Sequence, residues 1–493
     1  MTICKETNKM TEVIERQLYC IGEQIMKKTK MICTLGPASS NYETIAKLLR
    51  AGMNVARLNM SHGDISHHQK TLDLVLKARK ELNIPCAIMV DTCGPEIRIG
   101  EFEDGKVLLN KGDLFTFCTD HTIGTDKYVS CPYPELTNIL KPKQKIYANN
   151  GLLEFTVRKV ENGNIVCVVN IGGELSNHKS ISIPHTRLPL PFISKKDEEN
   201  IRFAVKNDVE YISASFVNTP ENVVEMQQLI SSLGGRQQII SKIESVEGIK
   251  NLDKIIEVSD GIMVARGDMG TEVPIEHIPA IQKMMIEKCI KNGKKVIVAT
   301  EMLESMTHRR RPTRAETTDV AQAIYDKTGA TMLSGETASG LFPVESATTM
   351  SKIALATEKQ VDYDKEFEAE CGKTPLDAIA HSACDTAKSV HAKAIVCWTD
   401  CGKTACAISK FRPQANIVAL THDEWTKNSL ALCWGIIPMV VEQQQSLDDL
   451  IAYTSKVVVE QKLAKKGDKI VITFGVPNSN STPTNSINIC VVQ

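Results

Sequence analysis

Residues 260–268 read DGIMVARGD, and residues 238–245 read QIISKIES. Each stretch is a short, nearly continuous apolar run that ends in charged residues. Such runs are typical of strands buried on both faces of a parallel sheet. The same pattern repeats along the chain from residue 28: a short apolar run that predicts a strand is followed by a segment that predicts an amphipathic helix.

The repeat contains eight strand candidates. They are KMICTLG (30–36), MNVARLNM (53–60), CAIMVDT (86–92), EYISASFV (210–217), QIISKIES, DGIMVARGD, KKVIVATEM (294–302) and ATMLSGET (330–337). Helical patterns such as NYETIAKLLRAG (41–52) lie between most of them. This α/β alternation predicts a parallel (β/α)8 TIM barrel. An open doubly wound sheet is the alternative, but eight consecutive units favour closure.

One unit of the repeat is interrupted. From about residue 101 to 182 the sequence reads as short strands and turns with no convincing helix, which predicts an inserted small β-barrel lid domain at the barrel's C-terminal face. A new alternation from about residue 375 predicts a C-terminal α/β domain. The expected division is 1–27 (N-terminal helical segment), 28–98 with 187–360 (barrel), 99–186 (lid) and 361–493 (C-terminal domain).

Polar residues end the predicted strands, where the active sites of such barrels lie. Arg57, Asn59 and Ser61 alternate after one strand, so they point the same way if the chain is extended. The full set is Arg57, Asn59, Ser61, Asp91, Thr92, Lys242, Glu244, Arg266, Asp268, Thr300 and Ser334. Any one of them alone is explained by an ion pair, a turn or a helix cap. Their convergence on one covered face favours a catalytic site.

These residue types also suit a particular chemistry. Glu244 and Asp268 are hard oxygen donors of the kind that Mg²⁺ prefers. Lys242 offers a point charge, and Arg57 offers a fork for phosphate oxygens. Such a site suits phosphoryl transfer, in which positioning and charge stabilisation dominate. A metal-assisted aldolase could use a similar set, so these residues leave the reaction open.

Composition excludes several other classes. The chain has 493 residues, 58 Lys plus Arg and 59 Asp plus Glu, giving a net charge of -1. No basic excess indicates a nucleic-acid partner. The 16 cysteines show neither zinc spacing nor a disulfide framework. No apolar run reaches the roughly 18 residues of a membrane span, and no signal peptide is apparent, so a cytoplasmic protein is expected.

Seven motifs occur in a specific order. They are MICTLGPAS (31–39), AGMNVARLNMSHG (51–63), DTCGPEIRIG (91–100), SDGIMVARGDMG (259–270), EMLESM (301–306), RPTRAE (311–316) and MLSGETASG (332–340). With this set the chain resembles the pyruvate kinase family along nearly its whole length. The resemblance implies phosphoryl transfer from phosphoenolpyruvate to ADP, the last step of glycolysis, in a homotetramer.

The resemblance also implies roles for individual residues. Lys242 would stabilise the moving phosphoryl group and the enolate, and Thr300 would lie near the enolate carbon. Glu244 and Asp268 would hold Mg²⁺ (or Mn²⁺). Backbone amides near Gly267 would bind the substrate carboxylate, since a helix N-terminus favours an anion. The implied phosphoenolpyruvate residues are Arg57, Lys242, Gly267, Asp268 and Thr300, of which Arg57, Lys242 and Thr300 would be catalytic.

A second implied set concerns K⁺ and the nucleotide. The oxygen donors for K⁺ are Asn59, Ser61, Asp91 and Thr92, and Glu96 is the family residue that accompanies K⁺ dependence. The nucleotide contacts are Asn59, His62, Arg98 and Lys196, together with Arg57. Departures from the family pattern occur at Cys93, Asn149, Asn150, Asn218, Glu301 and Gln322. These put nucleotide affinity and lid closure in question, and another barrel enzyme or a non-catalytic relative stays an alternative.

Overall fold

The computed structural model describes residues 20–21, 24–149, 151–184, 186, 190–363, 372, 374–444, 446–475 and 484–493. Three sequence predictions fall outside these ranges. They are most of the N-terminal helical segment, Asn150, and the expectation that the loop at 476–483, which has no Lys or Arg, does not bind the second phosphate of a sugar bisphosphate. Where the segment is described, β1 (Cys20–Ile21) pairs antiparallel with β2 (Gln24–Ile25), so a helix reaching Met26 is wrong. Isoleucine, which occurs in both β1 and β2, favours a strand.

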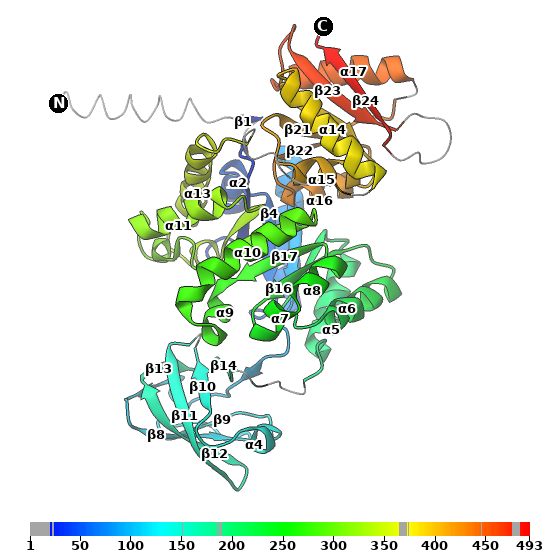
Figure 1. The fold of residues 1–493 in the computed structure, drawn as a ribbon. Coiled ribbons are helices and arrows are strands. Elements are labelled where there is room, and N and C mark those ends of the chain that lie inside the picture. The colour runs from blue at the N-terminus through cyan, green and yellow to red at the C-terminus, as the bar shows by residue number, and fades with distance from the viewer. Residues whose placement is uncertain are drawn as a thin grey trace, which may run out of the picture.

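Eight parallel strands form a closed barrel in the middle of the molecule (Figure 1). Around the barrel they follow the order β15-β16-β17-β18-β19-β3-β4-β5. The strands are β3 (Lys30–Leu35), β4 (Val55–Asn59), β5 (Ala87–Asp91), β15 (Tyr211–Ala214), β16 (Gln238–Ile243), β17 (Gly261–Ala265), β18 (Lys295–Ala299) and β19 (Ala330–Leu333). Each lies within a predicted apolar run, which confirms the barrel.

Helices surround the barrel and bury their apolar faces against it. They are α2 (Tyr42–Arg50), α3 (Ile65–Leu82), α5 (Lys195–Lys206), α6 (Pro220–Ser232), α7 (Val246–Lys250), α8 (Leu252–Val258), α9 (Arg266–Glu272), η1 (Ile275–His277), α10 (Ile278–Lys291), η2 (Glu304–Thr307), α11 (Arg314–Tyr325), α12 (Gly335–Ala338) and α13 (Pro343–Glu358). The RPTRAE motif starts α11 with a capping box, in which Thr313 and Glu316 satisfy each other's backbone N–H groups.

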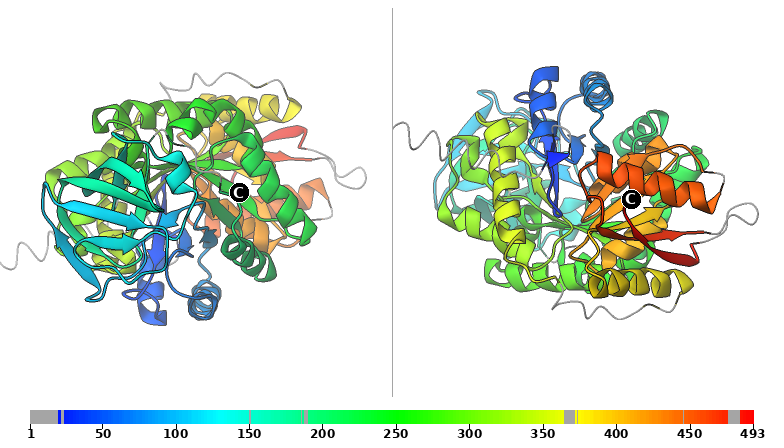
Figure 2. Two further views of the ribbon diagram at one scale, coloured as in Figure 1. Left: turned by 90° about the horizontal axis from the view of Figure 1, so that it is seen from below. Right: turned by 90° about the horizontal axis from the view of Figure 1, so that it is seen from above.

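The inserted lid lies at the end of the barrel where strands β16 and β17 finish. Its elements are β6 (Ile97–Arg98), β7 (Lys106–Leu109), β8 (Leu114–Cys118), β9 (Tyr128–Ser130), α4 (Leu136–Ile139), β10 (Lys145–Ala148), β11 (Leu153–Glu161), β12 (Asn164–Ile171), β13 (Gly173–Ser176) and β14 (Ser180–Ser182). Seven strands form one curled sheet, which among the described residues does not close into the barrel predicted. Phe115, Phe117 and Phe155 pack together in its core. Seen from the lid end, this sheet overlies the barrel (Figure 2).

The C-terminal domain packs against the opposite end of the barrel. It contains α14 (Pro375–Ser389), β20 (Ala394–Trp398), α15 (Lys403–Lys410), β21 (Asn416–Thr421), α16 (Glu424–Ser429), η3 (Leu430–Leu432), β22 (Ile436–Val440), α17 (Leu447–Glu460), β23 (Lys469–Phe474) and β24 (Ser486–Val491). Its sheet has the order β22-β21-β20-β23-β24, with β24 antiparallel.

One residue of this domain enters the barrel. Leu432 is 1% exposed and belongs to the apolar cluster inside the barrel, beside Tyr211. The Tyr211 hydroxyl donates a 2.6 Å hydrogen bond to the Ser429 carbonyl. The η3 segment therefore closes the floor of the barrel.

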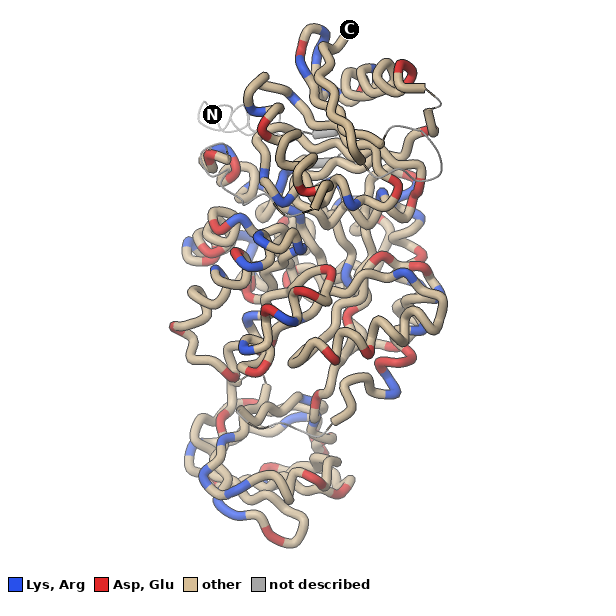
Figure 3. Tube along the Cα trace, turned by 45° about the vertical axis from the view of Figure 1, so that its right-hand side comes forward, with Lys and Arg blue, Asp and Glu red and all other residues tan. Residues whose placement is uncertain are grey.

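Charged residues of both signs are interspersed over the barrel and the C-terminal domain (Figure 3). No helix among the described residues has both the length and the apolar character needed to cross a membrane.

Candidate active site

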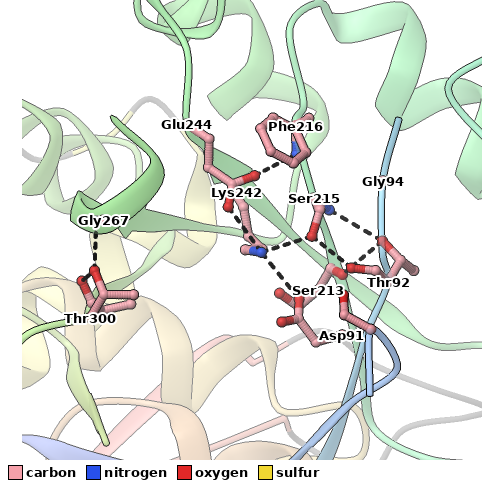
Figure 4. A network of polar contacts seen from close by, with 12 residues as sticks. Asp91, Thr92, Gly94, Ser213, Ser215, Phe216, Lys242, Glu244, Gly267 and Thr300 are labelled. Atoms are coloured by element: carbon pink, nitrogen blue, oxygen red, sulfur yellow. Dashed lines mark hydrogen bonds and ion pairs between the residues drawn. The ribbon is translucent and has the colours of Figure 1, made fainter. Parts of the chain in front are cut away.

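Lys242 and Glu244 lie at the lid end of β16, and both are buried. The Lys242 Nζ lies 2.9 Å from Glu244 Oε1 and 3.7 Å from Asp91 Oδ1 (Figure 4). Burial alone would lower the pKa of Lys242, but Asp91 and Glu244 outweigh it and raise that pKa above its usual value. Lys242 is therefore a permanent buried cation.

Two residues that the sequence analysis did not single out hold this pair in place. Lys242 Nζ donates a 2.7 Å hydrogen bond to Ser215 Oγ, and the Phe216 N–H donates a 2.6 Å bond to Glu244 Oε2. Phe216 has a φ of 54°, a left-handed conformation that costs free energy for a bulky residue. The SASF stretch after β15 contains both residues, but nothing in its pattern specifies these contacts.

Arg57 and Asp91 face each other across neighbouring strands β4 and β5. Arg57 Nε donates a 2.8 Å bond to Asp91 Oδ2, and Nη2 bonds to the same oxygen. Burial would raise the pKa of Asp91, but Arg57 and Lys242 outweigh it and lower that pKa. Asp91 Oδ1 is buried and has no hydrogen-bond partner among the described residues.

The remaining predicted K⁺ residues lie at the ends of the same two strands. Asn59 Oδ1 accepts a 3.2 Å bond from the Ser61 N–H. Thr92 is buried, and its carbonyl accepts a 2.7 Å bond from Ser215 Oγ. Gly94 packs tightly here, because a Cβ at this position would lie 2.8 Å from Ser215 Cβ. The DTCGPE turn thus requires glycine to bring the strand ends together.

Thr300 follows β18 in a strained turn. It has a φ of 70°, which is an outlier for a β-branched residue. Its Oγ1 accepts a 2.8 Å bond from the Gly267 N–H. Arg266 Nη2 donates a 2.6 Å bond to the Thr300 carbonyl, and Arg266 Nη1 lies 2.7 Å from Asp319. Arg266 therefore holds the turn in place, whereas the sequence identified Arg266 only as a polar residue at the end of a predicted strand.

The charged side chains of the candidate site have more carboxylates than cationic groups, and a bound cation would balance this excess of negative charge. Asp91, Glu244 and Asp268 oppose Lys242 and Arg57. Burial raises the pKa of Glu244 against the pull of Lys242, and repulsion from Asp268 raises it further. Among the described residues no cluster of three or more His, Cys, Asp or Glu side chains could hold a metal alone. A Mg²⁺ ion here would need substrate oxygens and water, as this ion usually does.

Several basic side chains surround His62. Partial desolvation and the charges of Arg98, Lys179, Arg57 and Lys196 lower the pKa of His62. Arg98 also pairs with Glu96 at 2.5 Å. Burial raises the pKa of Glu96, partly offset by Arg98. The structure thus brings the predicted nucleotide residues into one electropositive region.

A cavity of about 640 Å³ lies between the lid and the barrel. Glu96, Glu244 and Asp268 line it from the barrel side, and Tyr147 and Ser182 line it from the lid. Ser182 Oγ of the lid lies 3.3 Å from Thr271 Oγ1 of α9. The lid therefore already touches the barrel beside the candidate metal residues.

Three departures from the family pattern have clear contacts. Asn218 lines the cavity, and its side chain accepts a hydrogen bond from Ser245 Oγ. The Cys93 N–H donates a 2.8 Å bond to Asp197. Glu301 is exposed, and its carbonyl accepts a bond from Arg266.

Comparison with known proteins gives a consistent match. Residues 26–347 match the family model "Pyruvate kinase, barrel domain", and residues 377–490 match "Pyruvate kinase, alpha/beta domain". The chain is 43% identical over 473 residues to a pyruvate kinase of Clostridium acetobutylicum, covering 95% of this chain and 100% of that one.

Two further relatives agree. A pyruvate kinase of Clostridium perfringens is 44% identical over 471 residues, covering 94% of this chain and 99% of that one. A crystal structure of a pyruvate kinase from Cryptosporidium parvum superposes with a TM-score of 0.88 at 37% identity, covering 95% and 96% of the two chains.

Proposed function

The chain belongs to the pyruvate kinase family and forms pyruvate and ATP from phosphoenolpyruvate and ADP, and we propose here how its residues carry out that reaction. The observation that carries the proposal is the buried Lys242, which lies between Asp91 and Glu244, together with the cavity that Glu244 and Asp268 line. Phosphoryl transfer needs fixed positive charge where negative charge moves between oxygens.

Lys242 and Arg57 supply that charge. Lys242 stabilises the negative charge of the phosphoryl group during its transfer and then that of the enolate that remains. Its hydrogen bond to Ser215 Oγ holds the ammonium in position before the substrate arrives, so little reorganisation accompanies the reaction. Arg57 presents its planar guanidinium to the phosphate while Asp91 keeps it oriented.

The turn after β18 and the start of α9 lie near the carboxylate and the enolate carbon of the substrate. The Gly267 and Asp268 amides at the start of α9 bind the carboxylate, in place of the bond that Gly267 now makes to Thr300 Oγ1. Thr300 then lies close to the enolate carbon and participates in delivering the proton that yields pyruvate. Arg266 acts through Thr300 as a positioning residue, because it bonds to the carbonyl of that strained turn.

Members of this family generally use divalent and monovalent cations. We assign Mg²⁺ (or Mn²⁺) to Glu244 and Asp268, whose excess negative charge supports a cation. Bound there, the ion would neutralise charge on phosphoryl, enolate and carboxylate oxygens. We assign K⁺ to Asn59, Ser61, Asp91 and Thr92. Asp91 Oδ1 supports this assignment, because it accepts no hydrogen bond from the described residues and lies 3.7 Å from the Lys242 Nζ.

The nucleotide contacts follow from the electropositive region around His62. Arg98 and Lys196 attract the diphosphate, and the lowered pKa keeps the His62 ring neutral, so it can donate or accept a hydrogen bond. Asn59 adds an amide beside them. We place the active enzyme in the cytoplasm as a homotetramer, and the exposed Ile275 (78%) and Leu341 (69%) offer apolar surface for assembly.

A coupled assay of pyruvate formation tests the proposal. Pyruvate should form only when phosphoenolpyruvate, ADP and Mg²⁺ are all present, with equimolar ATP. Pyruvate formation without ADP would indicate a different barrel enzyme. Absence of turnover with intact phosphoenolpyruvate binding would indicate a non-catalytic relative.

A further inference from the structure

Two thiols far from the active site lie in direct contact. Cys406 Sγ on α15 lies 3.4 Å from Cys433 Sγ, which directly follows η3. Cys433 is 4% exposed, and Cys406 is half-buried. A disulfide needs an S–S distance of about 2.05 Å, so a side-chain movement of little more than 1 Å would join them.

The two elements that carry the thiols are already held together. Ser409 Oγ on α15 donates a 2.7 Å bond to the Trp434 carbonyl. Gly402, just before α15, packs so closely that a Cβ there would lie 2.9 Å from Leu430 Cδ2 of η3. The thiol pair is therefore preorganised by packing that does not depend on the sulfur atoms.

A small cavity of about 30 Å³ is lined by both cysteines. A single water needs roughly 10–15 Å³ measured in this way, so the cavity suits a molecule of about two waters' size. Its lining includes Cys406, Cys433, Lys294, Lys295, Lys410 and Arg412. Arg412 is 9% exposed, and its buried Nε has no hydrogen-bond partner among the described residues. The cavity thus has four cationic side chains in its lining, beside the two cysteines.

The cations also favour the reactive form of one thiol. The hydrogen bond from Cys406 lowers the pKa of Cys433 against the opposing effect of burial, and Lys295, Lys30 and Arg412 lower it further. Burial raises the pKa of other core cysteines, such as Cys289 and Cys397. The thiolate is the nucleophile in thiol oxidation, so Cys433 differs from these other cysteines in reactivity.

We propose that Cys406 and Cys433 form a peroxide-reactive dithiol, which hydrogen peroxide oxidises to an intrachain disulfide. Cys433 attacks one peroxide oxygen, so the S–O bond forms, the O–O bond breaks, and hydroxide leaves to take up a proton as water. Cys406 then attacks the sulfenic sulfur of Cys433, forming the S–S bond and releasing the second water. In sum, two thiols and one peroxide give one disulfide and two waters.

The site lies beneath the barrel floor. Leu432, the residue before Cys433, belongs to the apolar cluster inside the barrel. A disulfide would therefore connect α15 to the segment that closes the barrel, and a small-molecule thiol would restore the dithiol.

Peptide mapping of the full-length protein tests the proposal. The variant Cys401→Ser removes the exposed thiol nearest in sequence. After treatment with hydrogen peroxide, alkylation and trypsin, peptides 404–410 and 428–456 should be linked, about 2 Da lighter than their sum. Each contains one cysteine, so the assignment is unambiguous. Both peptides remaining alkylated under these conditions would overturn the proposal.

Two variants test the chemistry. Lys295→Met should slow disulfide formation at least about fivefold, because a nearby cation no longer favours the thiolate, whereas exposed Lys283→Met should not. In Cys406→Ser, Cys433 should accumulate a sulfenic acid that dimedone traps. If Cys406→Ser does not fold, the rate of disulfide formation in Lys295→Met still tests the proposal. An unchanged rate in folded Lys295→Met would overturn the proposed peroxide-reactive dithiol.

Discussion

Arg57 directs two hydrogen bonds to one oxygen of Asp91, while the other oxygen, Oδ1, is buried without a hydrogen-bond partner among the described residues. Arg57 is the proposed phosphate residue, and Asp91 is a proposed K⁺ ligand. A single ion pair thus connects the two proposed sites, and loss of its negative charge should affect the monovalent ion first.

Asp91→Asn should raise the K⁺ concentration for half-maximal activity at least about fivefold, because a neutral amide replaces a charged ligand. Activity measured against K⁺ at saturating phosphoenolpyruvate checks this. Asp73→Asn, on the exposed face of α3, is the matched control. An unchanged K⁺ response in folded Asp91→Asn would remove Asp91 from the ion site.

Lys242→Met should lower kcat by about 100-fold or more while leaving the fold intact. Loss of a charge contact made in the transition state costs about 3 kcal/mol or more, by analogy with a removed oxyanion donor. Initial rates, together with circular dichroism, check this, and the exposed Lys283→Met serves as control. Near-normal turnover in folded Lys242→Met would contradict the role.

Activity of the unchanged protein should depend on K⁺, and Glu96→Lys should relax that dependence by supplying an internal cation. Glu96 is largely buried beside Arg98, so the new ammonium would remain close to the site. Glu96→Gln separates the loss of negative charge from the gain of positive charge. Full activity of the unchanged protein without K⁺ or Na⁺ would refute the assignment.

Fructose bisphosphate should not appreciably lower the half-saturating phosphoenolpyruvate concentration. The family resemblance implies that an activating bisphosphate would need a hydroxyl-rich phosphate loop after the first strand of the C-terminal domain, between β20 and α15. Here Asp400 and Cys401 occupy that loop, and Thr404 Oγ1 already pairs with Thr484 Oγ1 at 2.6 Å. Asp400 disfavours a phosphate by like charge. A several-fold leftward shift of the saturation curve, abolished by Lys403→Met, would contradict this expectation.

Leu432→Ala should lower the free energy of unfolding by about 2–5 kcal/mol, because it leaves a cavity in the barrel floor. Leu108→Ala is the control, since Leu108 is 69% exposed. Urea unfolding of both variants measures the difference. Equal stability of the two would mean that Leu432 does not support the barrel.

The local sequence pattern was sufficient to predict the barrel and to place the charged residues at the ends of its strands. Apolar runs such as GIMVA indicate strands that are buried on both faces. Eight such runs that alternate with helices indicate that the strands close into a barrel. Because parallel strands end at the same face, the sequence also predicted that Lys242 and Asp91 would lie on one face of the barrel, although these residues lie far apart in the chain. Motifs such as RPTRAE indicate the family. The structure shows what this motif does physically, because its Thr313 and Glu316 form the capping box that starts α11.

The sequence by itself determined which side chains are available, on which strands they stand and to which family the chain belongs. Only the tertiary structure decided that Ser215 and Phe216 hold Lys242 and Glu244, that Arg266 clamps Thr300, and that Leu432 closes the barrel beside the Cys406–Cys433 pair. The physical reason is that strand and helix periodicity depends on neighbours in the chain. These contacts instead depend on the packing of segments whose relative position no local pattern encodes.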